Sequence, residues 1–226
     1  MAEILIVDDE RLIRDGMKAL FAGEGYSVRT ARDGEDALKK IAERRPDLVL
    51  LDVMMPKMNG FRTCEAIRRL DGRQPIVFLT AKDAETDEVR GIGLGADDFI
   101  SKSADETVLL ARVRRALERV ASLAPSVSSP RTLRLGAVIV DLDRHTVLAD
   151  GRESSLTSSE FELLRCLASR RGELFSNDDI FSFLRGEGYV GDPTAIRVHV
   201  MNLRRKLGKA GDLIVNVPNA GYYLIR

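Results

Sequence analysis

Short runs of apolar, mostly β-branched residues alternate with longer segments of helical period through the first 120 residues. Between the runs, apolar residues recur three or four positions apart, as one face of a helix requires. The five runs lie at residues 4–7, 27–30, 48–51, 76–80 and 99–100. Five strands alternating with five helices predict an α/β fold with a parallel, doubly wound sheet covered on both faces. In such sheets the functional crevice lies at the carboxyl ends of the strands.

After residue 130 the pattern changes to short strands, then three helices, then a hairpin. The strands are expected within 133–148, the helices at 158–169, 177–184 and 193–207, and the hairpin at 214–225. Ser176 and Asp179 have the spacing of a capping box, Pro193 suits a first helical position, and Gly208 stops the last helix. A short helix, a loop and a longer helix before a hairpin predict an α+β helix-turn-helix domain.

Composition adds a domain boundary to this picture. The 226 residues are 44% hydrophobic and 31% charged, the balance of a soluble globular protein. The uncharged segment 121–130, rich in Ser, Ala and Pro, predicts a linker between a domain at 1–120 and a domain at 131–226. The net charge of zero gives no argument for nucleic-acid binding, but the first domain carries −2 and the remainder +2.

Cysteine usage and hydropathy bear on the compartment. Cys64 and Cys166 have no second Cys or His at metal-ligand spacing, which argues against a disulfide scaffold or a zinc site. Both are expected in the core, and His145, beside a turn, is expected at the surface. No apolar run approaches the ~20 residues that span a bilayer, and the chain does not begin with a signal-peptide pattern. We therefore expect a cytoplasmic protein without membrane contact.

Polar residues follow four of the predicted strands at the point where each ends. They are Asp8 and Asp9 after the first strand, Asp52 after the third, Thr80 after the fourth and Lys102 after the fifth. Clustered carboxylates are costly unless a cation or chemistry compensates them. Carboxylate oxygens suit Mg²⁺, an ammonium and a hydroxyl suit a phosphoryl group, and a carboxylate can attack phosphorus. The set predicts an aspartyl phosphate.

Four spaced motifs make residues 1–120 similar to the receiver domain of bacterial two-component response regulators, which has the CheY-like fold. The motifs are Ile6-Val7-Asp8-Asp9, Asp52 followed by Pro56 and Gly60, Leu79-Thr80-Ala81, and the stretch from Gly95 to Lys102. The resemblance implies that Asp52 accepts a phosphoryl group from a sensor histidine kinase. It further implies that Asp9, Asp52 and the Met54 carbonyl hold Mg²⁺, with Asp8 acting through water. Lys102 and Thr80 would contact the phosphoryl oxygens, Ala81 would leave room for them, and Phe99 would be the switch aromatic.

The chain departs from the receiver pattern at two places. The lysine is followed by Ser103 where the family usually has a proline in a cis peptide. A cis bond before a residue other than proline costs about 2.5–4 kcal/mol, so we expect a trans bond here. A basic and an acidic residue that commonly pair across a dimer are replaced by Glu88 and Val108, whereas Asp98 and Arg112 keep another family pair. Exposed ion pairs contribute about 0–1 kcal/mol, so this loss does not forbid dimerisation, but it weakens the inference that phosphorylation drives a dimer.

The helix at 193–207 has one apolar stripe and several cationic positions. The apolar residues, expected to face the core, are Ile196, Val200, Leu203 and Leu207. The polar residues assigned to the other faces are Arg197, His199, Asn202, Arg204, Arg205 and Lys206. A charged stripe alone is typical of a solvated helix, but a preceding helix and a following hairpin favour a helix that enters a DNA major groove.

Residues 131–226 resemble the winged-helix effector domain of OmpR/PhoB-type transcription regulators. The matching stretches are Leu156 to Leu164, Gly191 to Leu207 and Ala220-Gly221-Tyr222. The resemblance implies that the last helix reads bases and that the hairpin is the wing. The residues that it places at the DNA are Thr194, Arg197, Val198, His199, Asn202, Arg204 and Arg205. Thr194, Arg197, Asn202 and the tract Val217-Pro218-Asn219 differ from the family pattern, which predicts a changed or weakened footprint.

The two halves together predict a transcription regulator, not an enzyme, that is controlled by phosphorylation. Asn202 would read adenine, and Arg204 would read guanine or hold a phosphate. An alternative is a regulator of the same build whose DNA binding or dimerisation does not depend on phosphate. An aspartate-based phosphatase is disfavoured, because its second acid would stand at Met54. The implied partners are a histidine kinase, double-stranded promoter DNA, RNA polymerase and a second copy of the chain, at least on DNA.

Overall fold

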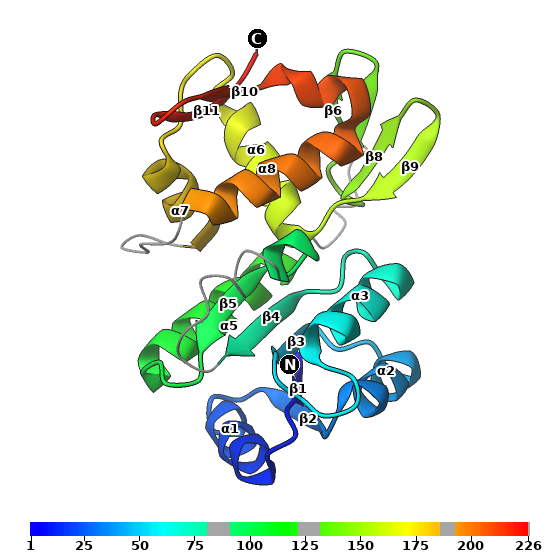
Figure 1. The fold of residues 1–226 in the computed structure, drawn as a ribbon, viewed down its shortest axis with the longest axis vertical. Coiled ribbons are helices and arrows are strands. Elements are labelled where there is room, and N and C mark those ends of the chain that lie inside the picture. The colour runs from blue at the N-terminus through cyan, green and yellow to red at the C-terminus, as the bar shows by residue number, and fades with distance from the viewer. Residues whose placement is uncertain (81–90, 122–131, 186–192, 226) are drawn as a thin grey trace. The chain divides into compact units, whose positions relative to one another are not determined.

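The chain divides into two compact units, Met1–Ala121 and Ser122–Arg226 (Figure 1). In the computed structural model the described residues are 1–80, 91–121, 132–185 and 193–225. The expected linker at 121–130 lies outside these ranges apart from Ala121, the last residue of a helix. No helix within the described ranges is both long and apolar enough to cross a bilayer.

The first unit is built around a parallel sheet with the strand order β2-β1-β3-β4-β5. Its strands are β1 (Glu3–Val7), β2 (Ser27–Ala31), β3 (Leu48–Asp52), β4 (Ile76–Thr80) and β5 (Asp98–Ser101). Val7 lies opposite Ala31 of β2 and Leu51 of β3, so neighbouring strands end at the same edge. The parallel α/β sheet predicted from the sequence is confirmed.

Helices cover both faces of this sheet (Figure 1). They are α1 (Arg11–Gly23), α2 (Gly34–Glu43), α3 (Gly60–Leu70) and α5 (Glu106–Ala121). Alternate strand residues point to opposite faces: Ile4 and Ile6 pack with α1 and α5 on one face. On the other face Phe78 of β4 packs edge-on against Phe61 of α3, with ring centroids 5.4 Å apart. The helix expected between β4 and β5 falls largely on 81–90, outside the described residues.

The second unit begins with an antiparallel sheet whose fourth strand the sequence reading missed. Its strands are β6 (Thr132–Leu135), β7 (Val138–Asp141), β8 (Thr146–Ala149) and β9 (Arg152–Ser155). β9 has no apolar alternation and no buried residue. Asp150 and Gly151, which join β8 to β9, have φ angles of 48° and 74°. An Asp-Gly pair with positive φ at both residues is the signature of a tight hairpin turn, and this signal would have revealed the strand.

The remainder of the second unit is helical and ends in a hairpin. Its elements are α6 (Ser158–Ser169), α7 (Asn177–Arg185), α8 (Pro193–Leu207), the 3₁₀ helix η1 (Gly208–Leu213), β10 (Ile214–Val217) and β11 (Gly221–Leu224). The predicted capping box is confirmed: the Asp179 N–H donates to the Ser176 hydroxyl at 3.1 Å, and the Ser176 N–H donates to the Asp179 carboxylate at 2.9 Å. Gly208, with φ 57°, ends α8 as predicted, but η1 was not predicted.

His145 is not at the surface, which corrects the sequence expectation. Its side chain is 3% exposed, and its ring stacks on Phe161 of α6 with centroids 3.4 Å apart. The turn between β7 and β8 folds over α6, so a residue beside a turn becomes part of the core. Cys64 and Cys166 are buried, as predicted.

Candidate functional site

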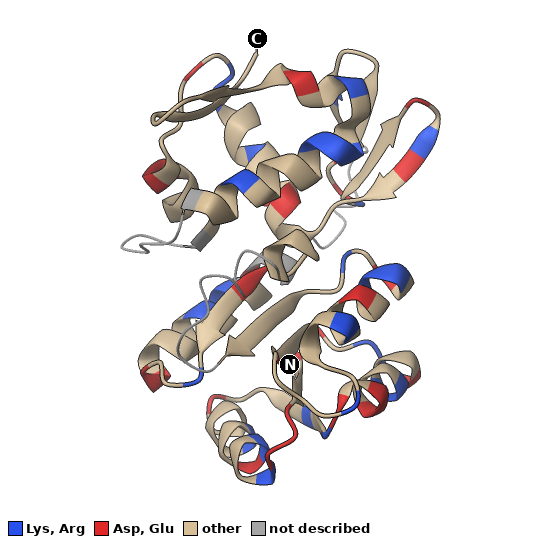
Figure 2. Ribbon diagram, viewed as in Figure 1, with Lys and Arg blue, Asp and Glu red and all other residues tan. Residues whose placement is uncertain are grey.

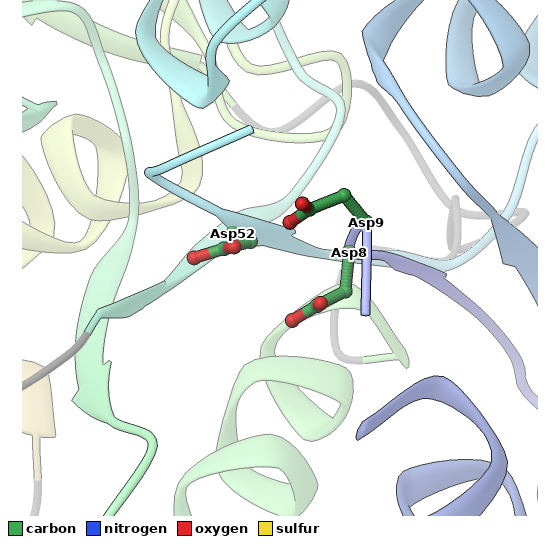
Figure 3. Close-up of side chains that lie close together, drawn as sticks. All are labelled: Asp8, Asp9 and Asp52. Carbon is green, nitrogen blue, oxygen red and sulfur yellow. The ribbon is translucent and has the colours of Figure 1, made fainter. Parts of the chain in front are cut away.

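Three carboxylates meet at the carboxyl edge of the parallel sheet. Asp8 and Asp9 directly follow β1, and Asp52 is the last residue of β3. Figure 3 shows their side chains projecting from the two strand ends into one region, and one oxygen of each lies within 4.8 Å of the others. The convergence predicted from parallel strand ends is therefore present.

Lys102 lies between two of these carboxylates. Its ammonium is 2.8 Å from Asp8 and 2.9 Å from Asp52. Asp8 and Asp52 are 0% and 2% exposed, while Asp9 is open to solvent. Burial raises the pKa of the Asp52 carboxyl and outweighs the opposing effect of the Lys102 ammonium. For Lys102 burial works to lower the pKa, but hydrogen bonds and charge from Asp8 and Asp52 outweigh it and the pKa is raised.

Backbone contacts fix the loops that carry the cluster. The Arg14 guanidinium donates to the carbonyls of Asp8 and Asp9 at 2.7 and 2.9 Å, which ties the loop after β1 to α1. The Met54 N–H donates to the Asp52 carboxylate at 3.3 Å, and the Met54 side chain is 72% exposed. These hydrogen bonds fix the backbone after β1 and orient the Asp52 carboxylate.

Thr80 and Phe99 lie on the strands that the sequence predicted for them. Thr80 is the last residue of β4, and Phe99 is the second residue of β5. Thr80 is buried, and its carbonyl accepts the Lys102 N–H at 2.7 Å. Phe99 is 5% exposed and packs against Phe78, with ring centroids 4.8 Å apart. A Cβ on Gly91 would overlap the Phe99 ring. Ala81 lies outside the described residues.

The two departures noted in the sequence have local consequences. The Lys102–Ser103 bond is trans, since the described residues contain no cis peptide. The Ser101 and Ser103 hydroxyls lie 2.8 Å apart in the loop that carries Lys102. Val108 is 42% exposed, Arg112 lies 3.5 Å from the Asp98 carboxylate, and Glu88 lies outside the described residues.

The donor chemistry of this cluster fits a hard divalent cation. Mg²⁺ prefers carboxylate, carbonyl and water oxygens, and the cluster offers carboxylates from Asp8, Asp9 and Asp52. The Lys102 ammonium, beside the same edge, can pair with an anionic group bound there. A buried carboxylate, metal-ligand oxygens and a fixed cation together suit transfer of a phosphoryl group to an aspartate.

A second candidate site lies on α8 in the second unit. The four predicted core residues, Ile196, Val200, Leu203 and Leu207, are all buried. α8 contacts α6 and α7 and also β8 and η1, so more than one side of this helix is covered. More residues of α8 are therefore buried than the four apolar residues that the sequence predicted.

His199 and Asn202 belong to the buried part of α8, which corrects the prediction that nucleic acid would meet them. They are 2% and 3% exposed. With about 100° of rotation per residue, His199 lies beside the core stripe. Asn202 lies beyond the edge of that stripe, so its burial comes from the elements packed around α8. Asn202 accepts a hydrogen bond from the Arg205 guanidinium at 3.3 Å. The expectation that Asn202 reads adenine does not fit this placement.

Two cationic residues of α8, one of them the expected DNA contact Arg204, are bound to the protein itself. The half-buried Arg204 donates to the Ile214 carbonyl of β10 at 2.6 Å, which joins α8 to the hairpin. Lys206 lies 2.6 Å from the buried Glu160 of α6. Figure 2 marks the lysines and arginines of α8, and those of the rest of its unit, in blue.

The outward face of α8 consists of residues three or four positions apart. Arg197, Met201 and Arg205 are exposed, and Thr194 and Val198 are partly exposed. The sequence reading missed Met201, which is 56% exposed. The sequence already indicated this position, because Met201 lies four residues from both Arg197 and Arg205, and residues four apart share one face of a helix.

Arg204→Ala is expected to destabilise the second unit although the side chain was predicted to bind DNA. Its loss leaves the Ile214 carbonyl without this donor, at a cost of about 1–2 kcal/mol in the free energy of unfolding. Urea denaturation followed by circular dichroism measures the change. Arg197→Ala, at an exposed position of the same helix, is the control and should shift stability by about 0.5 kcal/mol or less. Equal stability of the two variants would contradict the assigned role.

Comparisons with known proteins assign each unit to a family. Residues 4–114 match the response regulator receiver domain family, and residues 151–224 match the family described as transcriptional regulatory protein, C terminal. The chain is 37% identical to the alkaline phosphatase synthesis transcriptional regulatory protein PhoP of Bacillus subtilis, over 91% of this chain and 88% of that protein. It is 37% identical to the DNA-binding response regulator MtrA of Mycolicibacterium smegmatis, with 97% and 95% covered. The crystal structure of DrrB, an OmpR/PhoB homologue of Thermotoga maritima, aligns with a TM-score of 0.52 at 26% identity over the full length of both chains.

Proposed function

Since the chain belongs to the OmpR/PhoB family of response regulators, we propose that phosphorylation of Asp52 controls the DNA binding of α8. The observation that carries the proposal is the buried Asp52 carboxylate beside Lys102, with Asp8 and Asp9 at the same sheet edge. The family is one of transcription regulators, and a sensor histidine kinase and double-stranded promoter DNA are the partners that its two domains imply.

The residues of the first unit divide the transfer among them. An Asp52 oxygen attacks phosphorus, the bond from phosphorus to the kinase histidine nitrogen breaks, and that nitrogen keeps the electron pair. Lys102 pairs with the transferred oxygens, and Thr80 contacts one of them. Asp8, Asp9, Asp52 and the Met54 carbonyl are the groups that would hold Mg²⁺, which supplies neutralisation of the phosphoryl charge when bound.

The residues of α8 that meet DNA are the exposed ones. Arg197 and Arg205 supply cations to phosphates or guanine edges, and Thr194 and Val198 flank them. The hairpin of β10 and β11 is the wing, and Arg204 positions it through Ile214. We propose a homodimer on DNA and contact with RNA polymerase as further parts of this function. The exposed Val108, where relatives pair charges, favours the alternative that dimerisation does not depend on phosphate.

Selection of binding sites from random duplex DNA tests this function. The full chain, treated with acetyl phosphate and Mg²⁺, is expected to enrich one sequence and to shift it in a gel. Replacing Arg197 and Arg205 together by alanine should weaken binding and flatten the salt dependence, by about 0.9 in slope for each phosphate that the protein no longer neutralises. Arg134→Ala, an exposed arginine on β6, is the matched control. Failure to enrich any sequence at any salt concentration would refute the proposed function.

A further inference from the structure

Met201 is an exposed apolar side chain at the centre of a helix face that carries two exposed arginines. It is 56% exposed, whereas the other long apolar residues of α8, Ile196, Leu203 and Leu207, are 0% exposed. A single exposed methionine needs no explanation on most surfaces. Its neighbours make this one different, because the face around it is the one that the proposed function places against DNA.

The neighbours of Met201 on α8 set the chemistry of any ligand. Arg197 and Arg205 stand one turn before and one turn after it, and both are exposed. Val198, three residues before Met201, adds a second partly exposed apolar group. The face thus presents an apolar centre between two cations, which complements a polyanion that offers an apolar group between its phosphates.

The major groove of DNA offers one such group on its base edges, the C5 methyl of thymine. Adenine, guanine and cytosine present hydrogen-bonding groups there but no methyl group, and the thioether of Met201 is only a weak acceptor. Asn202, the residue of α8 whose amide suits adenine, is 3% exposed. The unbranched, flexible side chain of methionine can adjust its conformation to keep contact with a methyl group when the local geometry of the DNA varies.

We propose that Met201 is a specificity-determining residue that selects a thymine in the recognised sequence by contact with its C5 methyl. The inference rests on the proposed function, since it presumes that α8 enters the major groove. It replaces the adenine contact predicted for Asn202 with an apolar contact one residue earlier in the chain.

Deoxyuridine, which lacks the C5 methyl and keeps every hydrogen-bonding group of thymine, tests the contact. In the sequence enriched by the full chain, each thymine is replaced singly by deoxyuridine and the Kd is measured. We expect one position in each half-site at which the wild-type protein loses about fourfold in affinity, which corresponds to about 0.8 kcal/mol for one buried methyl. Met201→Ala should bind the thymine and deoxyuridine duplexes equally at that position.

Two further variants separate the contact from general effects on the helix. Met201→Leu keeps an apolar side chain and is expected to restore a preference for thymine. Leu174→Ala removes an exposed apolar residue of the same unit outside α8 and should keep the wild-type preference. Circular dichroism of each variant checks that the fold is intact, which the exposure of both positions favours.

The possible outcomes distinguish this inference from the function on which it rests. An enriched sequence with no loss at any deoxyuridine position would overturn the methyl contact and leave the proposed function standing. A loss that persists in Met201→Ala would also overturn it, because another residue would then read the methyl. Enrichment of no sequence would overturn the proposed function and this inference together.

Discussion

The Asp52→Asn variant is expected to take up no phosphoryl group from acetyl phosphate and Mg²⁺, under conditions in which the wild-type chain does. The carboxamide of asparagine is a poor nucleophile toward phosphorus and also removes one anionic oxygen from the set shared with Asp8 and Asp9. Intact-mass spectrometry of the treated protein measures the added group. Loss of uptake should be accompanied by loss of any change in DNA affinity that the phosphodonor causes in the wild type.

The fold of this variant is expected to remain intact, which makes the loss interpretable. Burial raises the pKa of the Asp52 carboxyl, so the charged form is less favourable in the folded chain than in the unfolded chain. The contribution of Asp52 to the free energy of unfolding therefore falls as the pH rises through its pKa. Asparagine stays neutral at every such pH, so the variant should unfold at no lower a urea concentration than the wild type at neutral pH.

Asp105→Asn provides the matched control, because Asp105 is an exposed carboxylate outside the cluster. It should take up the phosphoryl group as the wild type does. Uptake by Asp52→Asn at the wild-type level would show that another residue is the acceptor. Uptake by wild type and control without any effect on DNA affinity would support the alternative in which DNA binding does not depend on phosphate.

Gly60→Ala is expected to disrupt the first unit at the same sheet edge. Gly60 is the first residue of α3, and its N–H donates to the Val53 carbonyl at 3.0 Å. A Cβ at this position would overlap the carbonyl oxygen of Asp52 and lie 2.9 Å from the Cα of Val53. Both neighbours are backbone, so relief requires β3 or α3 to move. Overpacking of this kind costs roughly 2–3 kcal/mol in the free energy of unfolding, which urea denaturation measures.

Gly16→Ala separates this steric effect from the general effect of the substitution. Gly16 lies on the exposed side of α1, and a Cβ there would meet nothing within 4 Å. Alanine is the better helix former, so this variant should gain about 0.5–1 kcal/mol. In Gly60→Ala, hydrogen exchange should accelerate in peptides from β3 and α3, and phosphoryl uptake should fall with it. Unchanged stability would show that the backbone gives way at Gly60 without cost.

The residues of the acidic cluster could be predicted from the sequence, because in a parallel sheet the strand order already brings the residues at the strand ends to one edge. Once apolar runs identified β1, β3 and β5, the residues after them had to meet at one edge, and Asp8, Asp52 and Lys102 do. The strand β9 escaped detection because apolar periodicity is absent from it, although Asp150-Gly151 marked its turn. The burial of His145 against Phe161 joins a turn and a helix that are distant in sequence, and no local pattern reports such a contact.

Periodicity along single elements and the order of the strands suffice to predict the two fold classes, the acidic edge with its lysine, and the core stripe of α8. Which polar residues of α8 remain available to DNA depends instead on how the whole unit packs. α8 contacts α6, α7, β8 and η1, so His199 and Asn202 are buried and Arg204 is turned to the hairpin, while Met201 is exposed between Arg197 and Arg205. Burial of a helix face depends on every element packed around it, and that information lies outside the sequence of the helix.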